Sequence, residues 1–303
     1  MTSTSQNDRV MGKNNGGIMK TLIAAIALFV AVPALADQPV LSEQQRTDEI
    51  RKMHWVKTGA VDLDASKSSI SLPPDYMMIS GPEARRFDFI TNAQEDPNTE
   101  AVVANMKTDN IVFFQYLNEG FITTDDWSDV DASKMLADIR DNTETANAER
   151  RKQNVEELHV IDWLQQPVFD RQQNVVFWTL RLHAASGDLV NAIALRLGRY
   201  GYEEMIWVTD LNAYRAGPDD QKAMLQAHSF DSGAKYADHI GGDKLAGYGI
   251  ASLVAVAAGA KLTKLVGFAA LLLLAKKFGI VILAAVAGAI AWVKRQFSRK
   301  SSV

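Results

Sequence analysis

Residues 175–182 (VVFWTLRL) and residues 189–197 (LVNAIALRL) decide the fold of this chain. Both runs are rich in the β-branched, aromatic and other apolar residues that favour strands. Residues 184–188 (AASGD) lie between them and supply the small and polar residues of a tight connection, so the sequence predicts an antiparallel hairpin. A third strand is expected at residues 205–209, after a glycine-containing turn at residues 198–201.

The predicted helices lie in blocks outside this β-rich region. Residues 42–57 carry apolar residues at spacings of three, as one face of a helix does, and residues 131–153 form the longest predicted helix. A buried strand is expected at residues 110–116 and a final helix at residues 219–228. Because helices and hairpins are segregated and nothing alternates as β–α–β, the sequence predicts an α+β fold with an antiparallel sheet.

The C-terminal region has the composition of a membrane anchor. Residues 245–293 are almost entirely Leu, Ala, Val, Ile and Gly, with a few lysines, and a basic segment follows at residues 294–300. Residues 278–293 are the clearest predicted span, and residues 245–260 are expected to form a second one, so the anchor is one transmembrane helix or a helical hairpin. Small residues in the second segment would let helices pack closely. The expected partners are the lipid bilayer and a membrane protein or a second copy of the chain.

The N-terminal region has the pattern of a secretory signal peptide. The pair MK at residues 19–20 is followed by an apolar run and by ALA at residues 34–36. The run is too short to span a bilayer, which needs about 20 apolar residues. We expect cleavage before Asp37, and the alternative is an uncleaved N-terminal anchor. A polar stretch precedes Met19, which leaves open whether translation starts at Met1 or Met19.

These signals predict three regions. Residues 1–36 are an N-terminal extension and signal peptide, residues 37–242 an exported α+β domain, and residues 243–303 a membrane anchor with a basic tail. The expected location is the inner (cytoplasmic) membrane, with the main domain in the periplasm.

Composition excludes several kinds of chemistry. The chain has no cysteine, which removes thiol nucleophiles, cysteine-ligated metals and disulfides. The formal charge is −4, and the acidic exported domain offers no basic stripe, so nucleic-acid binding is not expected. No phosphate-binding glycine loop is present, and no cofactor is expected. The five histidines are scattered without an i, i+4 pair, so no metal site is expected either.

One set of residues could support general acid–base chemistry. His159 is close in sequence to Asp162 and Asp170, and a histidine beside carboxylates can transfer protons. The alternative is a histidine at the end of a strand that meets a carbonyl group or water. The chain has no G-x-S-x-G nucleophile motif.

Other residues are candidates for binding. Trp163 and Phe169 belong to residues 163–170, which are predicted to form a stiff surface loop with one buried Trp, and such loops often carry recognition. Arg199 follows a strand in a glycine-flanked turn, where its guanidinium could bind a carboxylate or phosphate, or tie down its own turn. Asn191, in the second strand of the hairpin, is a further binding candidate.

An ordered set of short motifs runs through the chain. These are Gly120-Phe121-Ile122 with Asp125-Asp126, Asn147 with Arg150, Trp163 with Pro167 and Asp170, Asn191 with Leu197-Gly198-Arg199, Lys235-Tyr236-Ala237-Asp238, Asp243-Lys244 and Tyr248-Gly249. From about Glu43 to the end, the set resembles the bacterial family of uncharacterised membrane-anchored proteins, domain of unknown function 2167. Phe169 stands where a Tyr is common, and Asp162 where a Gly is common.

The resemblance implies a signal peptide, an exported domain and a C-terminal anchor, and it implies no established activity, cofactor or catalytic residue. Together with the lack of a catalytic motif, it favours a non-enzymatic binding or scaffolding role at the periplasmic face of the membrane. The alternative is a periplasmic hydrolase that acts on an envelope component through His159 with Asp162 or Asp170.

Overall fold

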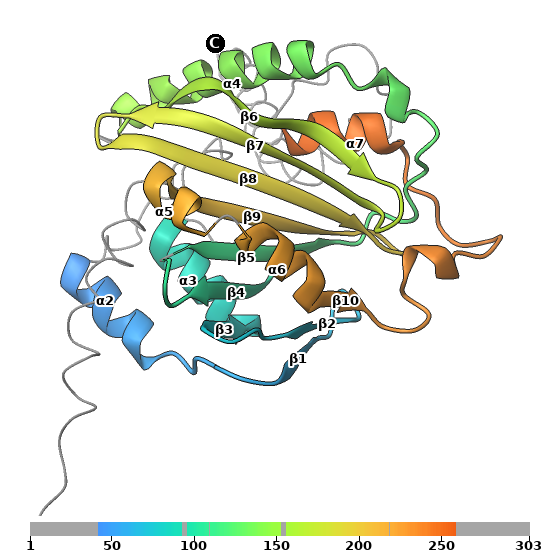
Figure 1. The fold of residues 1–303 in the computed structure, drawn as a ribbon, viewed down its shortest axis with the longest axis horizontal. Coiled ribbons are helices and arrows are strands. Elements are labelled where there is room, and N and C mark those ends of the chain that lie inside the picture. Colours follow the sequence, from blue (N-terminus) through green and yellow to red (C-terminus); the bar gives the residue numbers. More distant parts are fainter. Residues whose placement is uncertain (1–41, 93–95, 109, 153–155, 218, 259–303) are drawn as a thin grey trace, which may run out of the picture.

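A seven-stranded sheet forms the centre of the molecule (Figure 1). The computed structural model describes residues 42–92, 96–108, 110–152, 156–217 and 219–258. The strands are β3 (Tyr76–Ser80), β4 (Thr99–Asn105), β5 (Ile111–Leu117), β6 (His159–Asp170), β7 (Val175–Ala184), β8 (Gly187–Leu197) and β9 (Tyr202–Asp210). Their order is β3-β4-β5-β9-β8-β7-β6, and every neighbouring pair is antiparallel. The predicted α+β fold with an antiparallel sheet is confirmed.

The β7–β8 hairpin lies where the sequence predicts it. Trp178 pairs with Ile193, and the pairing continues without a shift to the turn, where Gly187 has a φ of +135°. Trp178 is fully buried, because its side chain packs in a hydrophobic core on one face of the sheet. The neighbouring strand β9 continues the sheet and confirms the third predicted strand.

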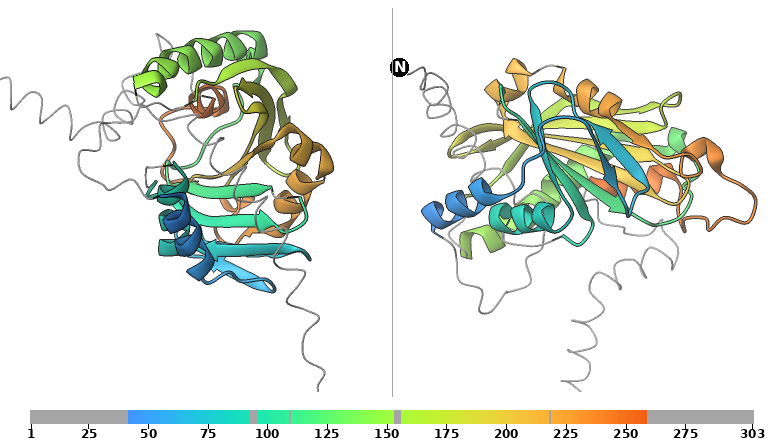
Figure 2. Two further views of the ribbon diagram at one scale, coloured as in Figure 1. Left: turned by 90° about the vertical axis from the view of Figure 1, so that its left-hand side faces the viewer. Right: turned by 90° about the horizontal axis from the view of Figure 1, so that it is seen from below.

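One face of the sheet is covered by α6 (Asp220–Ala227) and by a second, three-stranded sheet (Figures 1 and 2). This small sheet has the order β1-β2-β10, from β1 (Ala60–Leu63), β2 (Ser68–Ser71) and β10 (His228–Phe230). Ile70 of β2 and Met224 of α6 pack against Phe114 and Trp207 of the main sheet. We call this side the α6 face.

The opposite face is covered by helices. They are α3 (Gly81–Asn92), α4 (Ala132–Lys152) and α7 (Ile250–Ala257), with α2 (Glu43–Lys52) packed outside α3. Phe87 of α3 packs near β4 and β5, while Ile139 of α4 and Leu253 of α7 pack near β6 to β8. Figure 2 shows the main sheet between these helices and the elements of the α6 face. The short remaining helices are η1 (Trp127–Asp129), α5 (Leu211–Ala216) and η2 (Tyr236–Asp238).

The longest helix begins as the sequence predicts. Asp131 accepts hydrogen bonds from the main-chain N–H groups of Ser133 and Lys134, each at 2.9 Å, which satisfies two of the free donors at the start of α4. The apolar side chains of Met135 and Ile139 then face the sheet.

A buried carboxylate ties α6 to the main sheet. Asp220 accepts hydrogen bonds from Tyr76 Oη at 2.5 Å, Asn105 Nδ2 at 2.7 Å and Thr108 Oγ1 at 2.9 Å, and also from Asn110 Nδ2. Burial and the neighbouring carboxylate raise the pKa of the Tyr76 hydroxyl well above its usual value, so this phenol stays a donor. The partners are more than one hundred residues away in the chain, so no local sequence pattern indicates them.

The segment 163–170 differs from the predicted surface loop. It belongs to β6, an edge strand whose pairing with β7 shifts register at three places. Pro167 is compatible with this position because the outer side of an edge strand needs no main-chain donor. The irregular pairing and the proline together hide the strand from a pattern-based prediction.

Residues 245–260 also differ from expectation where they are described. Instead of a membrane span, residues 250–257 form the short helix α7, and Ile250, Leu253 and Val254 are fully buried in the hydrophobic core beside β7 and β8. A segment of Leu, Ile, Val and Ala fits a protein core as well as a bilayer, which is why composition alone did not separate the two. The domain boundary predicted after residue 242 therefore precedes residues that pack in the core of the domain.

No helix within the described part of the chain is long and apolar enough to cross a membrane. The predicted signal peptide at residues 1–36 and the predicted span at residues 278–293 lie outside the described residues.

Candidate functional site

The three candidates for acid–base chemistry all lie on β6, but each has its own partner. His159 and Asp170 begin and end the strand, so a rise of about 3.3 Å per residue separates them by roughly 30 Å or more. His159 Nδ1 lies 2.8 Å from Glu144 Oε1 of α4, and this contact lowers the pKa of Glu144. Asp162 makes a two-pronged ion pair with Arg181 at 3.1 and 3.0 Å.

Asp170 closes the turn between β6 and β7. It accepts hydrogen bonds from the main-chain N–H groups of Gln172 and Gln173 at 2.8 and 3.1 Å, and these bonds lower the pKa of its carboxyl group. The structure therefore does not bring His159, Asp162 and Asp170 together. Among the described residues, no group of three or more His, Cys, Asp or Glu side chains is placed to hold a metal ion.

The aromatic and amide candidates are also separated. Trp163 donates from Nε1 to Ala132 O at 3.2 Å, and Phe169 packs against Trp127 with ring centroids 5.5 Å apart. Asn191 is 2% exposed in the middle of β8, where it is out of reach of a ligand. Trp163 and Phe169 thus attach β6 to the segment around α4.

Arg199 is the exception, because it lies at the centre of a connected site. Its Nε and Nη2 donate to the two carboxylate oxygens of Asp243 at 2.8 and 2.9 Å, and its Nη1 donates to Gly233 O at 3.3 Å. Its main-chain N–H also donates to Ala234 O. Of the two roles left open by the sequence, this geometry matches the second: Arg199 ties down its own turn and the loop around residues 233–243.

Asp243 collects further hydrogen bonds in the same place. Its Oδ2 accepts from the main-chain N–H of Ile240 at 2.9 Å and lies 3.1 Å from His239 Nδ1. The Arg199 guanidinium and these donors hold the pKa of Asp243 well below its usual value, and Asp243 in turn raises the pKa of Arg199. The pair is therefore ionised across the physiological pH range.

Three stacked rings extend the site. Phe121 stacks on His239 with centroids 3.7 Å apart and planes at 10°, and on Tyr236 with centroids 4.5 Å apart. Tyr236 Oη donates to Ile122 O at 2.8 Å, which fixes the outer ring. We call Arg199, Asp243, His239, Phe121 and Tyr236 the Arg199 network.

Main-chain contacts lock three distant segments around this network. Phe121 forms a parallel bridge with Leu245, with N–H···O bonds of 2.8 Å on both sides, and Gly198 pairs with Lys235. A Cβ atom added to Gly201 would lie 2.0 Å from Leu117 O, so only glycine allows this approach. The segments near residues 120, 199 and 240 consequently form one rigid surface.

This surface carries exposed apolar side chains. Ile240 is 58% exposed and Leu245 is 57% exposed, the highest values among the large apolar residues that the structure describes. Lys235 and Lys244 are exposed beside them. Ile240 and Leu245 are held directly by the network, through Asp243 and Phe121 respectively.

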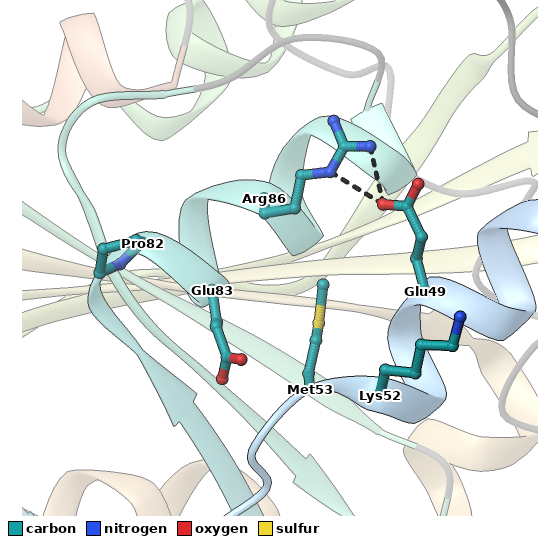
Figure 3. Close-up of a pocket in the computed structure, with 6 residues that line it drawn as sticks. All are labelled: Glu49, Lys52, Met53, Pro82, Glu83 and Arg86. Carbon is teal, nitrogen blue, oxygen red and sulfur yellow. Dashed lines mark hydrogen bonds and ion pairs between the residues drawn. The ribbon is translucent and has the colours of Figure 1, made fainter.

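Apart from this surface, an open hollow lies between α2 and α3 (Figure 3). It is an open groove of about 280 Å³ whose lining includes Met53 and Pro82. Three of its four charged side chains are engaged, because Arg86 bonds Glu49 at 2.7 Å and Glu83 bonds His54 at 2.8 Å, and the fourth, Lys52, is exposed. The groove therefore carries less indication of a ligand than the Arg199 network.

The fold and the site define an α+β domain with a seven-stranded antiparallel sheet and a rigid, partly apolar surface at one end. The chain belongs to the family described as protein of unknown function (DUF2167), which matches residues 55–287. This match confirms the family resemblance expected from the motifs. A search of curated proteins finds no match.

The fold has a distant similarity to a solved structure. The chain is similar to the solution structure of cyanobacterial PsbP (CyanoP) from Synechocystis sp. PCC 6803, with 8% sequence identity and a TM-score of 0.37. The alignment covers 66% of this chain and 100% of that one. At this TM-score the similarity carries no argument about function.

The sequence indicates Arg199 as a binding candidate but does not indicate the other members of its network. Phe121, Tyr236 and Asp243 belong to the motifs that carry the family resemblance, and His239 adjoins one of them. The ordered set of motifs is the feature of the sequence that indicates this site, because several of its members are far apart in the chain and meet at the Arg199 network.

Proposed function

We propose that the protein is a non-enzymatic recognition module, anchored at the periplasmic face of the inner membrane, and that the surface around the Arg199 network binds a protein partner in the same membrane. The observation that carries this proposal is the exposure of Ile240 and Leu245 on a rigid support. Apolar residues whose main chain is already fixed lose little backbone entropy on binding, so they suit an interface anchor.

The charges of the network favour recognition over catalysis. All three guanidinium nitrogens of Arg199 and both oxygens of Asp243 make hydrogen bonds, to each other or to Gly233 O in the case of Nη1. These groups support the surface and leave the exposed apolar and lysine side chains for contact. The predicted C-terminal anchor would raise the effective concentration of a partner in the same membrane.

In-cell photo-crosslinking of the full-length chain tests this proposal. A photoreactive residue is introduced at position 240 or 245, and at the exposed position Ala185 in the β7–β8 turn as a matched control. We expect one defined adduct from 240 and 245 and none from 185. With the probe at 240, Leu245→Asp is expected to remove the adduct, whereas Val168→Asp, at an exposed apolar site on β6, is expected to retain it.

Protease resistance of each variant checks that it is folded. The proposal is wrong if folded protein gives no adduct from 240 or 245, gives the same adduct from 185, or keeps the adduct after Leu245→Asp. Analysis of the adduct also separates a different protein from a second copy of this chain.

A further inference from the structure

A fully buried carboxylate lies on the α6 face of the sheet and takes no part in the hydrogen bonds of the Arg199 network. Glu203 is 0% exposed, and neither of its side-chain oxygens has a hydrogen-bond partner among the described residues. It stands near the start of β9, beside Tyr116 of β5 and opposite Arg196 of β8. An ionised carboxylate without a partner is very costly in such a place, so Glu203 needs a proton or a cation.

A second buried carboxylate lies close to it. Glu100 is 8% exposed and sits at the irregularity in the pairing of β4 with β5. Its Oε1 accepts from the main-chain N–H of Ser66 at 3.0 Å, while its Oε2 has no partner among the described residues. The negative charges of Glu100 and Glu203 oppose each other's ionisation.

A buried hydrogen-bond chain joins Glu100 to the three-stranded sheet. Ser66 Oγ lies 2.7 Å from Ser68 Oγ of β2, which lies 3.0 Å from His228 Nε2 of β10. Ser66, Ser68 and His228 are each 1% exposed. The two carboxylates and this chain therefore occupy the junction between the main sheet and the small sheet.

The groups that face the carboxylates do not neutralise them. The guanidinium of Arg196 donates to Leu225 O of α6, and its Nε has no partner within the described chain. Burial and the positive charge of Arg196 lower the pKa of His228 to about 3, so its imidazole is neutral. Other ionisable groups nearby are Tyr116 of β5, Glu204 of β9, Tyr200 in the turn before β9, and Asp64 and Lys67 in the turn between β1 and β2. The Lys67 ammonium and the Arg199 guanidinium both lie over the Tyr200 ring.

We propose that Glu203, together with Glu100, is a proton-binding site that holds the three-stranded sheet against the main sheet, and that loss of the proton loosens this junction. A proton neutralises Glu203 without the several oxygen ligands that a metal cation needs. The three-stranded sheet is small and lies over the site, so it is the element that yields when a charge appears beneath it.

The direction of the pH effect follows from burial. Burial raises the pKa of Glu203 well above its usual value and raises that of Glu100 as well. A group with a raised pKa in the folded state gives stability that is complete below its unfolded pKa of about 4.3 and is lost as the pH rises through the folded pKa. Glu203 therefore lowers the free energy of unfolding progressively above about pH 4.3.

Thermal unfolding of the full chain, measured between about pH 5 and about pH 9, tests the proposal. We expect the Tm of the natural protein to fall across this range, and the Tm of Glu203→Gln and Glu203→Met to fall clearly less. Asp129→Asn, at an exposed position of η1 on the helix-covered side of the sheet, is the control and is expected to keep the natural slope. Hydrogen exchange of Ile70 and His228, corrected for the intrinsic rate, is expected to lose protection at high pH in the natural protein only.

Infrared spectroscopy gives a readout that does not depend on stability. A carboxylic acid carbonyl band that persists at neutral pH and disappears in Glu203→Gln is expected. Equal slopes for the natural protein and both Glu203 variants, or the absence of that band, would overturn the proposal. Recovery of the lost stability on adding sodium or calcium at high pH would also overturn it, because the site would then take a metal cation.

Discussion

The side-chain amide of Asn147 pairs with the main chain of Leu158 on both sides. Asn147 Nδ2 donates to Leu158 O at 2.8 Å, and the Leu158 N–H donates to Asn147 Oδ1 at 3.0 Å. Asn147 is fully buried, so no water competes for these bonds. The pair fixes the distance between α4 and the chain that enters β6.

Asn147→Ala is expected to lower the free energy of unfolding by about 2–4 kcal/mol. The substitution leaves the buried N–H and C=O of Leu158 without partners, and each unsatisfied group costs about 1–3 kcal/mol. Denaturant-induced unfolding measures the change. Thr145→Ala, at an exposed position of the same helix, is the control and is expected to change the stability by less than about 0.5 kcal/mol.

Asp220→Ala is expected to cost about 3 kcal/mol or more, because it removes the acceptor shared by Tyr76, Asn105, Thr108 and Asn110. Urea unfolding followed by tryptophan fluorescence measures it. The neighbouring Asp219→Ala is a sharp control, since Asp219 precedes α6 without a side-chain capping bond. Equal losses for the two variants would contradict the central role of Asp220.

Gly201→Ala is expected to destabilise the domain by about 1–3 kcal/mol or more. Its Cβ would lie 2.0 Å from a main-chain oxygen, which cannot move without disturbing the pairing of β5 with β9. Gly241→Ala, where no atom lies within 4 Å of the added Cβ, is expected to be neutral. Thermal unfolding compares the two alanine variants, and similar melting temperatures would contradict the close approach.

Arg199→Ala and Asp243→Ala are each expected to lower the Tm, and the double variant to lower it by much less than the sum. Two residues that act through one shared ion pair are not additive. Strict additivity in this double-mutant cycle would show that the pair is not coupled.

The same pair has a pH signature of the opposite sign to that of Glu203. Because the folded pKa of Asp243 is depressed, its contribution is complete above its ordinary pKa of about 3.9 and is lost as the pH falls below that value. Asp243→Asn is therefore expected to flatten the loss of stability in acid. Equilibrium unfolding at several acidic pH values measures this effect, and an unchanged acid limb would contradict the assigned pair.

The parts of the fold predicted from sequence are those that depend on neighbouring residues. The apolar runs of β7 and β8 and the start of the long helix near residue 131 depend on residues a few positions apart, and the sequence predicts both. Strand β6 was missed because its shifts of register and Pro167 break the alternation. Helix α7 was assigned to a membrane segment because apolar residues are compatible with both environments.

The site was harder to predict because its contacts are distant in the chain. Arg199 and Asp243 are 44 residues apart, and Phe121 meets His239 across an even longer interval. The sequence places Arg199 in a turn but cannot say which carboxylate it meets. The sequence does not indicate that Glu203 is buried, because Glu203-Glu204 is an ordinary polar dipeptide. Only the fold shows that one of the two side chains faces the core.

The packing of α7 has a mechanical consequence. Ile250, Leu253, Val254 and the last described residue, Ala258, are all completely buried, so the described chain ends inside the hydrophobic core. A protein cut before residue 250 would lose part of its core, so a fragment that keeps the whole core must extend through residue 258. A force applied at Ala258 would act on the hydrophobic core directly, so tension at this residue and unfolding of the domain are coupled.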